Sequence, residues 1–140
     1  MKHQPILNYA SRLREAGNAF ILDELAKAGL HDIAPSHGDI LAQLLASETL
    51  NMSDLALNAH RTKSTVTALV TKLEKHGYVE RIPDPDDSRG VKVRLTDKGR
   101  RLRPAFESIS EGLQRMILSR ITADEARELE RLLKKCVEEE

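Results

Sequence analysis

Hydroxyl-bearing and basic side chains recur along residues 62–77 at a spacing that would place them on one face of a helix. Ser64, Thr67 and Thr71 fall on that face together with Lys75, and no acidic residue lies among them. Hydroxyl groups both donate and accept hydrogen bonds, and the side chains at the beginning of this face are small. These properties suit insertion into the major groove of DNA, where base edges present donors and acceptors.

A second candidate for contact with DNA is Arg89, in the polar stretch PDPDDSRG at residues 83–90. This stretch is too polar to pack in a core, and Gly90 is expected at the point where the chain turns back. Narrow minor grooves concentrate negative potential and attract arginine side chains. An arginine near the tip of a projecting hairpin is therefore well placed to enter a minor groove.

Secondary-structure elements on both sides of Gly77 would position these groups. Thr62 is a predicted helix N-cap and Gly77 a predicted helix stop. The buried stripe of this helix would comprise Val66, Leu69, Val70 and Leu73. Residues 79–82 form a predicted strand, and the second strand alternates buried Val91, Val93 and Leu95 with exposed Lys92 and Arg94. A helix followed directly by such a hairpin predicts a winged helix.

The distribution of charge agrees with this prediction. The formal net charge of the 140-residue chain is zero, but residues 60–103 contain 12 Lys or Arg and 6 Asp or Glu, which gives +6. The remaining residues hold 10 of the 22 basic and 16 of the 22 acidic side chains, which gives −6. Basic charge that coincides with the helix and the hairpin is the electrostatic pattern of nucleic-acid binding.

The patterns STVT…LE..G.V.R and DP.D.R…V.LT..G make the chain resemble the MarR (multiple antibiotic resistance regulator) family of bacterial transcription factors. The resemblance extends over nearly the whole chain through the order of the predicted helices. The residues that carry it are Ser64, Thr65, Val66, Thr67, Leu73, Glu74, Gly77, Val79, Arg81, Asp84, Pro85, Asp87, Arg89, Val93, Leu95, Thr96 and Gly99.

The resemblance implies a homodimer that binds an inverted-repeat (palindromic) operator on double-stranded DNA. The recognition helix would enter the major groove and Arg89 the minor groove, with Asp87 steadying that arginine. We expect base or adjacent phosphate contacts from Ser64, Thr65, Thr67 and Thr71, and phosphate contacts from Arg61, Lys63 and Lys72. Arg61 belongs to the turn His60-Arg61, where the family more often has a glycine followed by an apolar residue.

Other predicted helices surround the winged helix. The first covers residues 5–28 and ends at Gly29, the second begins at Pro35 with Ser36 as its cap, and Asn51 to Asp54 begin a short third helix. Thr96 caps the helix after the hairpin, and Gly99 in its first turn allows close packing. This helix should run to about residue 121 with a kink near residues 100–104, because Pro104 lacks a backbone donor. Thr122 and Glu125 form a predicted capping box for the last helix.

Length and composition predict one intertwined domain per chain, mainly α with a small β-hairpin wing (α+β). We expect an N-terminal dimerisation helix at 1–33, a winged helix-turn-helix DNA-binding lobe at 34–100 and C-terminal dimerisation helices at 101–140. An alternative leaves the terminal helices in an intrachain bundle. No apolar run approaches 18 residues and no signal peptide is visible, so we expect a cytoplasmic protein with no membrane partner.

No pattern indicates an enzyme, a cofactor or a metal site. His31 and His37 lie near Asp32 and Asp39, and since some members of the resembling family sense zinc near this junction, a metal-sensing regulator remains an alternative. Cys136 lies on an apolar stripe of the last helix, which predicts an inert thiol buried at the dimer interface.

The resemblance also implies a small effector, often an anionic aromatic compound, bound in a cleft between the dimerisation helices and the winged-helix lobe. Arg14 and His37 are candidates to face that cleft. Effector binding would change the spacing of the two recognition helices and release a repressor from its operator. The alternative from another functional class is a winged-helix module that binds a protein partner and has no operator.

Overall fold

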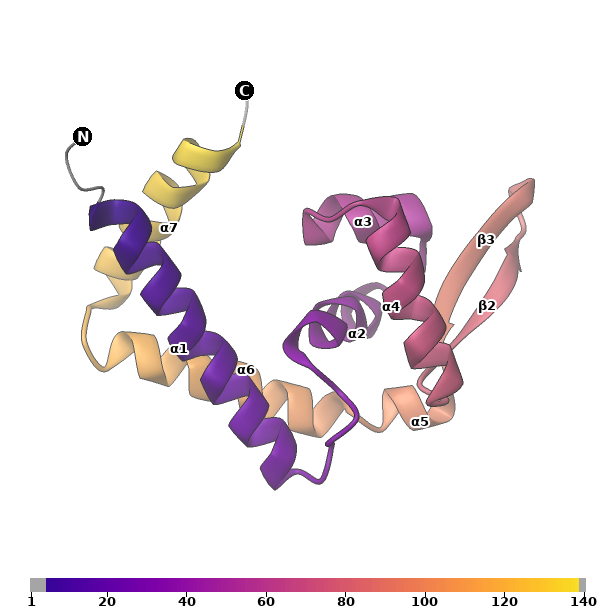
Figure 1. Cartoon of the computed structure of the whole chain (residues 1–140), viewed down its shortest axis with the longest axis horizontal. Coiled ribbons are helices and arrows are strands. Elements are labelled where there is room, and N and C mark those ends of the chain that lie inside the picture. Colours follow the sequence, from indigo (N-terminus) through magenta and orange to yellow (C-terminus); the bar gives the residue numbers. More distant parts are fainter. Residues whose placement is uncertain (1–4, 139–140) are drawn as a thin grey trace.

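The computed structural model describes residues 5–138 as helices packed around a small antiparallel sheet, which confirms the predicted fold class. Figure 1 shows the winged-helix lobe on one side and crossing helices on the other. The elements are α1 (Pro5–Lys27), α2 (Pro35–Ser47), β1 (Thr49–Asn51), α3 (Met52–Ala59), α4 (Lys63–Lys75), β2 (Val79–Asp84), β3 (Asp87–Leu95), α5 (Asp97–Arg100), α6 (Arg103–Leu118) and α7 (Ala123–Val137). Within residues 5–138, no helix has the length and apolar character needed to cross a membrane.

The sheet has the strand order β1-β3-β2, so the predicted hairpin is extended by one strand. β1 pairs antiparallel with β3, with Leu50 opposite Val93. This three-residue strand was not predicted because it is too short to show an alternating pattern. Its pairing holds the end of α2 and the start of α3 against the hairpin that follows α4.

The hairpin turns at Pro85 and Asp86, so the prediction that the chain turns back at Gly90 was wrong. Asp84 pairs with Asp87 and Pro83 with Val91, so residues 88–90 form a bulge in β3. A Cβ atom on Gly90 would lie 3.1 Å from Cβ of Asp84. The glycine is therefore explained by close packing beneath the bulge, because its Cα lies against the opposite strand.

Four of the predicted helix caps are confirmed. Asn51, Thr62, Thr96 and Thr122 each accept a hydrogen bond from the backbone N–H three residues later. The prediction that Ser36 caps α2 was wrong. Ala34 holds the N-cap position and Pro35 the first helical position, where a missing N–H costs nothing.

One apolar core lies beneath α4 and the sheet and fixes their relative positions. Val66, Val70 and Leu73 of α4 are buried as predicted, and Leu69 is partly buried. Val93 and Leu95 of β3 are also buried. Val91 is 41% exposed, contrary to its predicted inward position, because the hairpin extends past the edge of the core at that point. The same core also contains Leu25, Ile33, Ile40, Leu41, Leu44, Leu55, Tyr78, Val79, Leu102 and Ile109.

The predicted kink near Pro104 is a complete break between two helices. α5 ends at Arg100 and α6 begins at Arg103, with Pro104 in its first turn. Nη2 of Arg103 donates to the backbone O of Leu45 at 2.7 Å. The start of α6 is therefore tied to the end of α2, which joins the terminal helices to the winged-helix lobe.

Candidate nucleic-acid interface

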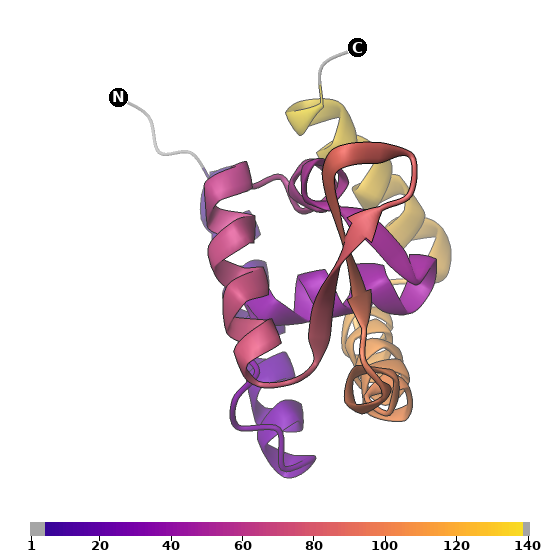
Figure 2. The ribbon, with the colours of Figure 1, turned by 90° about the vertical axis from the view of Figure 1, so that its right-hand side faces the viewer.

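A groove of about 410 Å³ separates the start of α4 from the β2–β3 hairpin, and we call it the wing groove. Figure 2 shows α4 and the hairpin side by side on the face turned toward the viewer. Lys63, Thr67, Asp87 and Arg89, all predicted members of the DNA-binding site, line this groove together. Its other lining residues are Asn51, Met52, Ser53, Arg81, Asp84, Gly90 and Val91.

The hydroxyl groups in the middle of α4 are already oriented by the helix. Oγ1 of Thr67 donates to the backbone O of Lys63 at 2.8 Å, and Oγ1 of Thr71 donates to the backbone O of Thr67 at 2.9 Å. Threonines commonly form this bond to the carbonyl four residues earlier. Because these hydroxyls donate their protons within the helix, they can only accept further hydrogen bonds.

Arg81 on β2 was not among the predicted site residues. Its Nη2 atom donates to Oγ1 of Thr71 at 2.7 Å, and its Nε lies 3.7 Å from Oε1 of Glu74. Arg81 thus ties the exposed hydroxyl of Thr71 on α4 to the hairpin. The sequence did place Arg81 at an outward position of the strand that follows Gly77, and this pattern could have indicated that it belongs to the site.

The first turn of α4 presents a different arrangement. Oγ1 of Thr62 accepts from the backbone N of Thr65 at 3.2 Å and donates to Oγ1 of Thr65 at 2.8 Å. The Thr65 hydroxyl therefore accepts a hydrogen bond from Thr62, and its own proton remains available to donate to another molecule. Ser64 and Lys72 are exposed as well, but neither side chain lines the wing groove.

Asp87 contacts the main chain of the bulge. Its Oδ1 atom accepts from the backbone N of Arg89 at 3.0 Å. At the turn, Oδ1 of Asp84 similarly accepts from the backbone N of Asp86 at 2.9 Å. These bonds hold the bulge that carries the exposed Arg89.

The turn before α4 is built around His60, which has a left-handed backbone with φ of 54°. Histidine tolerates this region better than bulky apolar residues do. Its backbone N–H bonds to the carbonyls of Ala56 and Leu57 and closes α3. Arg61 follows and lines a second groove of about 650 Å³, which we call the arm groove. Its lining residues are Arg14, Asp39, Ala42, Gln43, Asn58, Ala59, His60 and Arg61.

The structure does not bring the two candidate effector residues together. Arg14 is exposed on α1 and lines the arm groove. His37 is buried, and its Nδ1 atom accepts from the backbone N of Ala34 at 3.2 Å. Burial lowers the pKa of His37, and the positive charges of Lys72 and His76 lower that pKa further. His37 is therefore a neutral cap of α2 in the native protein.

This cap should make stability depend on pH. The native pKa of His37 lies below its unfolded value of about 6.5. The contribution of this cap to the free energy of unfolding is therefore complete above that pH and is lost as the pH falls. A glutamine side chain at this position could still accept from Ala34, as glutamine does in a capping box. In His37→Gln, the free energy of unfolding by urea should fall less between pH 7.5 and pH 5 than in the wild type. Equal pH dependence in the two proteins would contradict this role.

Among residues 5–138, no group of three or more His, Cys, Asp or Glu side chains is placed to hold a metal ion. Asp32 instead accepts from the Tyr78 hydroxyl at 3.0 Å and lies 3.6 Å from Nδ1 of His76. Burial and this hydrogen bond raise the pKa of Tyr78 to about 12, so its hydroxyl remains a neutral donor. These contacts join the α1–α2 loop to the end of α4.

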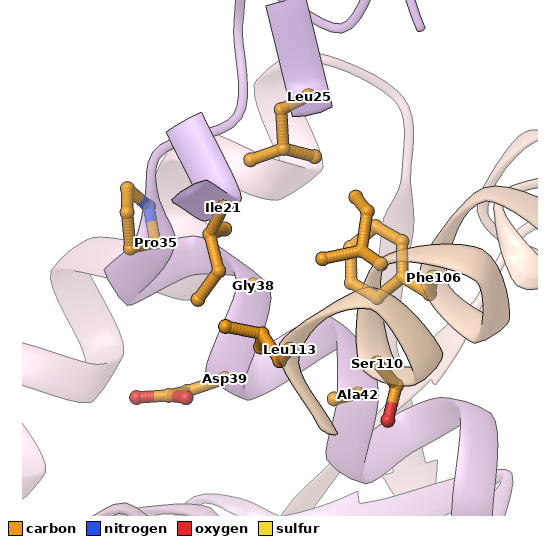
Figure 3. A pocket seen from close by; sticks show the side chains of 10 residues that line it. Ile21, Leu25, Pro35, Gly38, Asp39, Ala42, Phe106, Ser110 and Leu113 are labelled. Atoms are coloured by element: carbon orange, nitrogen blue, oxygen red, sulfur yellow. The ribbon is translucent and has the colours of Figure 1, made fainter. Parts of the chain in front are cut away.

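An apolar cavity of about 210 Å³ lies where α1 and α6 meet α2, and we call it the arm cavity. Figure 3 shows the side chains that converge on it from these three helices. They are Ile21, Leu25, Pro35, Gly38, Asp39, Ala42, Phe106, Ile109, Ser110 and Leu113.

Large apolar side chains of the terminal helices are exposed in the single chain. Ile6 of α1 is 73% exposed and Val137 of α7 is 76% exposed. Others on the same helices are Leu7, Tyr9, Leu13, Leu22, Leu129, Leu132 and Leu133. Cys136 of α7 is also exposed. Exposed apolar surface of this extent marks an interaction surface in a protein of this size.

Comparisons with known proteins agree with this geometry. Residues 33–91 match the model of the MarR family. The multiple antibiotic resistance protein MarR of Escherichia coli is 30% identical over 105 residues, which are 74% of this chain and 73% of that protein. The transcriptional repressor Rv2887 of Mycobacterium tuberculosis is 32% identical over 68% of each chain. The chain spans about half the length of three other curated relatives (55%, 48% and 49%).

Solved structures show the same fold. A MarR variant from Escherichia coli in complex with operator DNA has a TM-score of 0.84 at 24% identity, covering 96% of this chain and 94% of that chain. NadR in complex with 4-hydroxyphenylacetate has a TM-score of 0.79 at 26% identity, covering 100% and 97%.

Proposed function

This chain belongs to the MarR family of DNA-binding transcriptional regulators, and from that premise we propose that it is a homodimeric cytoplasmic repressor of an inverted-repeat operator. The observation that carries the proposal is the wing groove. Lys63 and Thr67 of α4 and Arg89 of the hairpin line it together, although they are far apart in sequence. Its helix side would follow the major groove, and its hairpin side would reach the adjacent minor groove. The similarity to a MarR–operator complex supports this arrangement.

The terminal helices support the proposal of a dimer. Their exposed apolar side chains would be buried by the same helices of a second copy. We assign dimerisation to residues 1–33 and 101–140 and DNA binding to residues 34–100; residues 1–4 and 139–140 of this division lie outside the described part. Two-fold symmetry would present two α4 helices about one DNA turn (~34 Å) apart.

Release from DNA by a small effector is the third part of the proposal. The arm cavity lies between the terminal helices and α2, and α2 packs on α4. A compound bound there would change the position of the winged-helix lobe relative to the dimerisation helices. The similarity to NadR, solved with 4-hydroxyphenylacetate, supports this assignment.

Binding to the protein's own promoter region tests the proposal. Fluorescence anisotropy should show tight binding that an excess of unrelated DNA does not compete away. A duplex with one half-site should bind far more weakly than the complete inverted repeat. Weak binding that is indifferent to sequence would favour a winged-helix module for a protein partner.

Arg89→Ala should weaken operator binding at least about tenfold, because an arginine in a minor groove contributes on the order of one to three kcal/mol. The dimer should persist, since Arg89 lies in the hairpin and far from the terminal helices. Arg120→Ala, in the turn between α6 and α7, removes the same charge elsewhere and should leave affinity nearly unchanged. Unchanged affinity of Arg89→Ala at matched salt would refute the assignment of the wing.

A further inference from the structure

Asp32, in the loop between α1 and α2, contacts two residues that directly follow α4. Its Oδ1 atom accepts from the Tyr78 hydroxyl at 3.0 Å, and its Oδ2 atom lies 3.6 Å from Nδ1 of His76. Figure 2 shows the end of α4 directly above the last turn of α1 and the loop that follows it. The loop that leaves α1, a proposed dimerisation helix, is therefore bonded to the end of the proposed recognition helix.

Asp32 is carried by a short loop whose two ends are fixed to helices. At the start of the loop, the backbone N of Leu30 donates to the backbone O of Leu25 in α1 at 2.8 Å. At its end, Ile33 is buried in the core, and α2 begins at Pro35. Because both ends of the loop are held in this way, a displacement of the Asp32 carboxylate would also displace the end of α1.

Tyr78 is an equally fixed partner. Its side chain is buried, its backbone N donates to the backbone O of Leu73 in α4, and its backbone O accepts from Thr96, each at 3.0 Å. Nζ of Lys98 in α5 lies 4.4 Å from the centre of the Tyr78 ring and donates to the backbone O of His76 at 2.7 Å. The Tyr78 hydroxyl is therefore held at a fixed position relative to α4.

The chain passes between the terminal helices and the winged-helix lobe at two places, and a side-chain bond lies at each. The first place is the α1–α2 loop, with the bond between Asp32 and Tyr78. The second is the start of α6, where Arg103 donates to the backbone O of Leu45. Arg103 holds the end of α2, whereas Asp32 holds the end of α4 itself. The angle of α4 relative to the terminal helices therefore depends most directly on Asp32.

This angle matters for a dimer that binds two half-sites on one DNA molecule. Once one half-site is bound, binding of the second is intramolecular, and its effective concentration depends on how well the protein spans the two sites. We propose that Asp32 is a positioning residue that fixes the angle of α4 against the dimerisation helices and thereby determines which half-site spacing the dimer accepts. The inference rests on the proposed function, because it presupposes a dimer on an inverted repeat.

Distances between the two α4 helices of a dimer test the inference without DNA. Tyr78→Phe removes one oxygen atom and leaves the ring beside Lys98, and Asp32→Ala removes the other partner. Spin labels at Ser64→Cys, in a Cys136→Ser background, would lie on the exposed first turn of each α4. The distance distribution from pulsed electron paramagnetic resonance should widen at least about 1.5-fold in both variants, because the lobe would sample more orientations.

Operators of different spacing give the functional result. One base pair inserted between the half-sites shifts and rotates one of them, so wild-type affinity should fall at least about tenfold. In Tyr78→Phe and Asp32→Ala, affinity for the native operator should fall about three- to tenfold, and the penalty for the inserted base pair should shrink by the same factor. The loss stays moderate because the Asp32 side chain is 33% exposed and water can replace its bonds.

Binding to a duplex with a single half-site separates positioning from folding. It should stay within about twofold of the wild type in both variants, because α4 and the hairpin keep their side chains. The variant with both substitutions should be no weaker than either single variant, since both remove the same bond. Asp23→Ala is the matched control, because its carboxylate lies 3.0 Å from Nζ of Lys27 within α1 and removes the same charge. It should leave distances and spacing preference unchanged.

Each result has a definite meaning. An unchanged distance distribution, or equal losses on the half-site and the complete operator with an unchanged spacing penalty, would overturn the inference and leave the proposed regulator intact. Wider distances in variants of a protein that binds no operator would support the positioning role and reject the proposed function. Absence of dipolar coupling between the labels in the wild type would show a monomer and reject both.

Discussion

Operator affinity should fall by about 10⁴-fold between 50 and 200 mM salt if each dimer contacts roughly eight phosphates, which corresponds to a log–log slope near −7. The physical reason is the segregated charge of the chain. Residues 60–103 carry +6 and the remainder −6, so the protein is neutral as a whole while the segment that contains α4 and the hairpin is basic. Binding would release the counterions that the contacted phosphates hold. Anisotropy titrations at five salt concentrations would measure the slope.

Two variants separate local contacts from overall charge. Lys63→Ala removes one side chain of the wing groove per protomer and should make the slope shallower by about 2 for a dimer. Lys135→Ala on α7 removes the same charge from the opposite part of the chain and should leave the slope unchanged. A slope near zero in the wild type would mean that the basic lobe does not bind the DNA backbone.

Local features of the structure could be predicted from the sequence because neighbouring residues determine them. Thr62 caps α4 through the N–H of Thr65, and Gly77 ends the helix with φ of 82°. Both depend on a few consecutive residues. The position of the N-cap of α2 was missed since Ala34 has no side-chain signal, and the contact that defines it comes from His37.

The parts of the site that depend on distant segments were less predictable. The bond between Arg81 and Thr71 requires the hairpin to lie against α4 at one particular register. Arg14 and His37 lie on different helices, α1 and α2, and no sequence pattern specifies how these helices pack. The wing groove was anticipated only as two separate contacts, one on a helix and one on a hairpin. Its single continuous lining is a property of the folded chain.

Gly99→Ala should destabilise the protein by about 1–3 kcal/mol, because the added methyl group would enter occupied space. A Cβ atom at this position would lie 2.2 Å from the backbone O of Tyr78 and 2.9 Å from Cδ2 of Leu95. The carbonyl cannot move freely, since it also accepts from the backbone N of Thr96 at 3.0 Å. Urea denaturation of the purified variant would measure the loss.

Gly17→Ala provides the matched control, and its effect should have the opposite sign. Gly17 lies inside α1, and a Cβ atom there would meet nothing within 4 Å, so alanine should stabilise the helix by about 0.5–1 kcal/mol. Opposite effects of the two substitutions would show that close packing around position 99, and not the loss of a glycine as such, lowers the free energy of unfolding. A neutral Gly99→Ala would mean that α5 can move away from Tyr78.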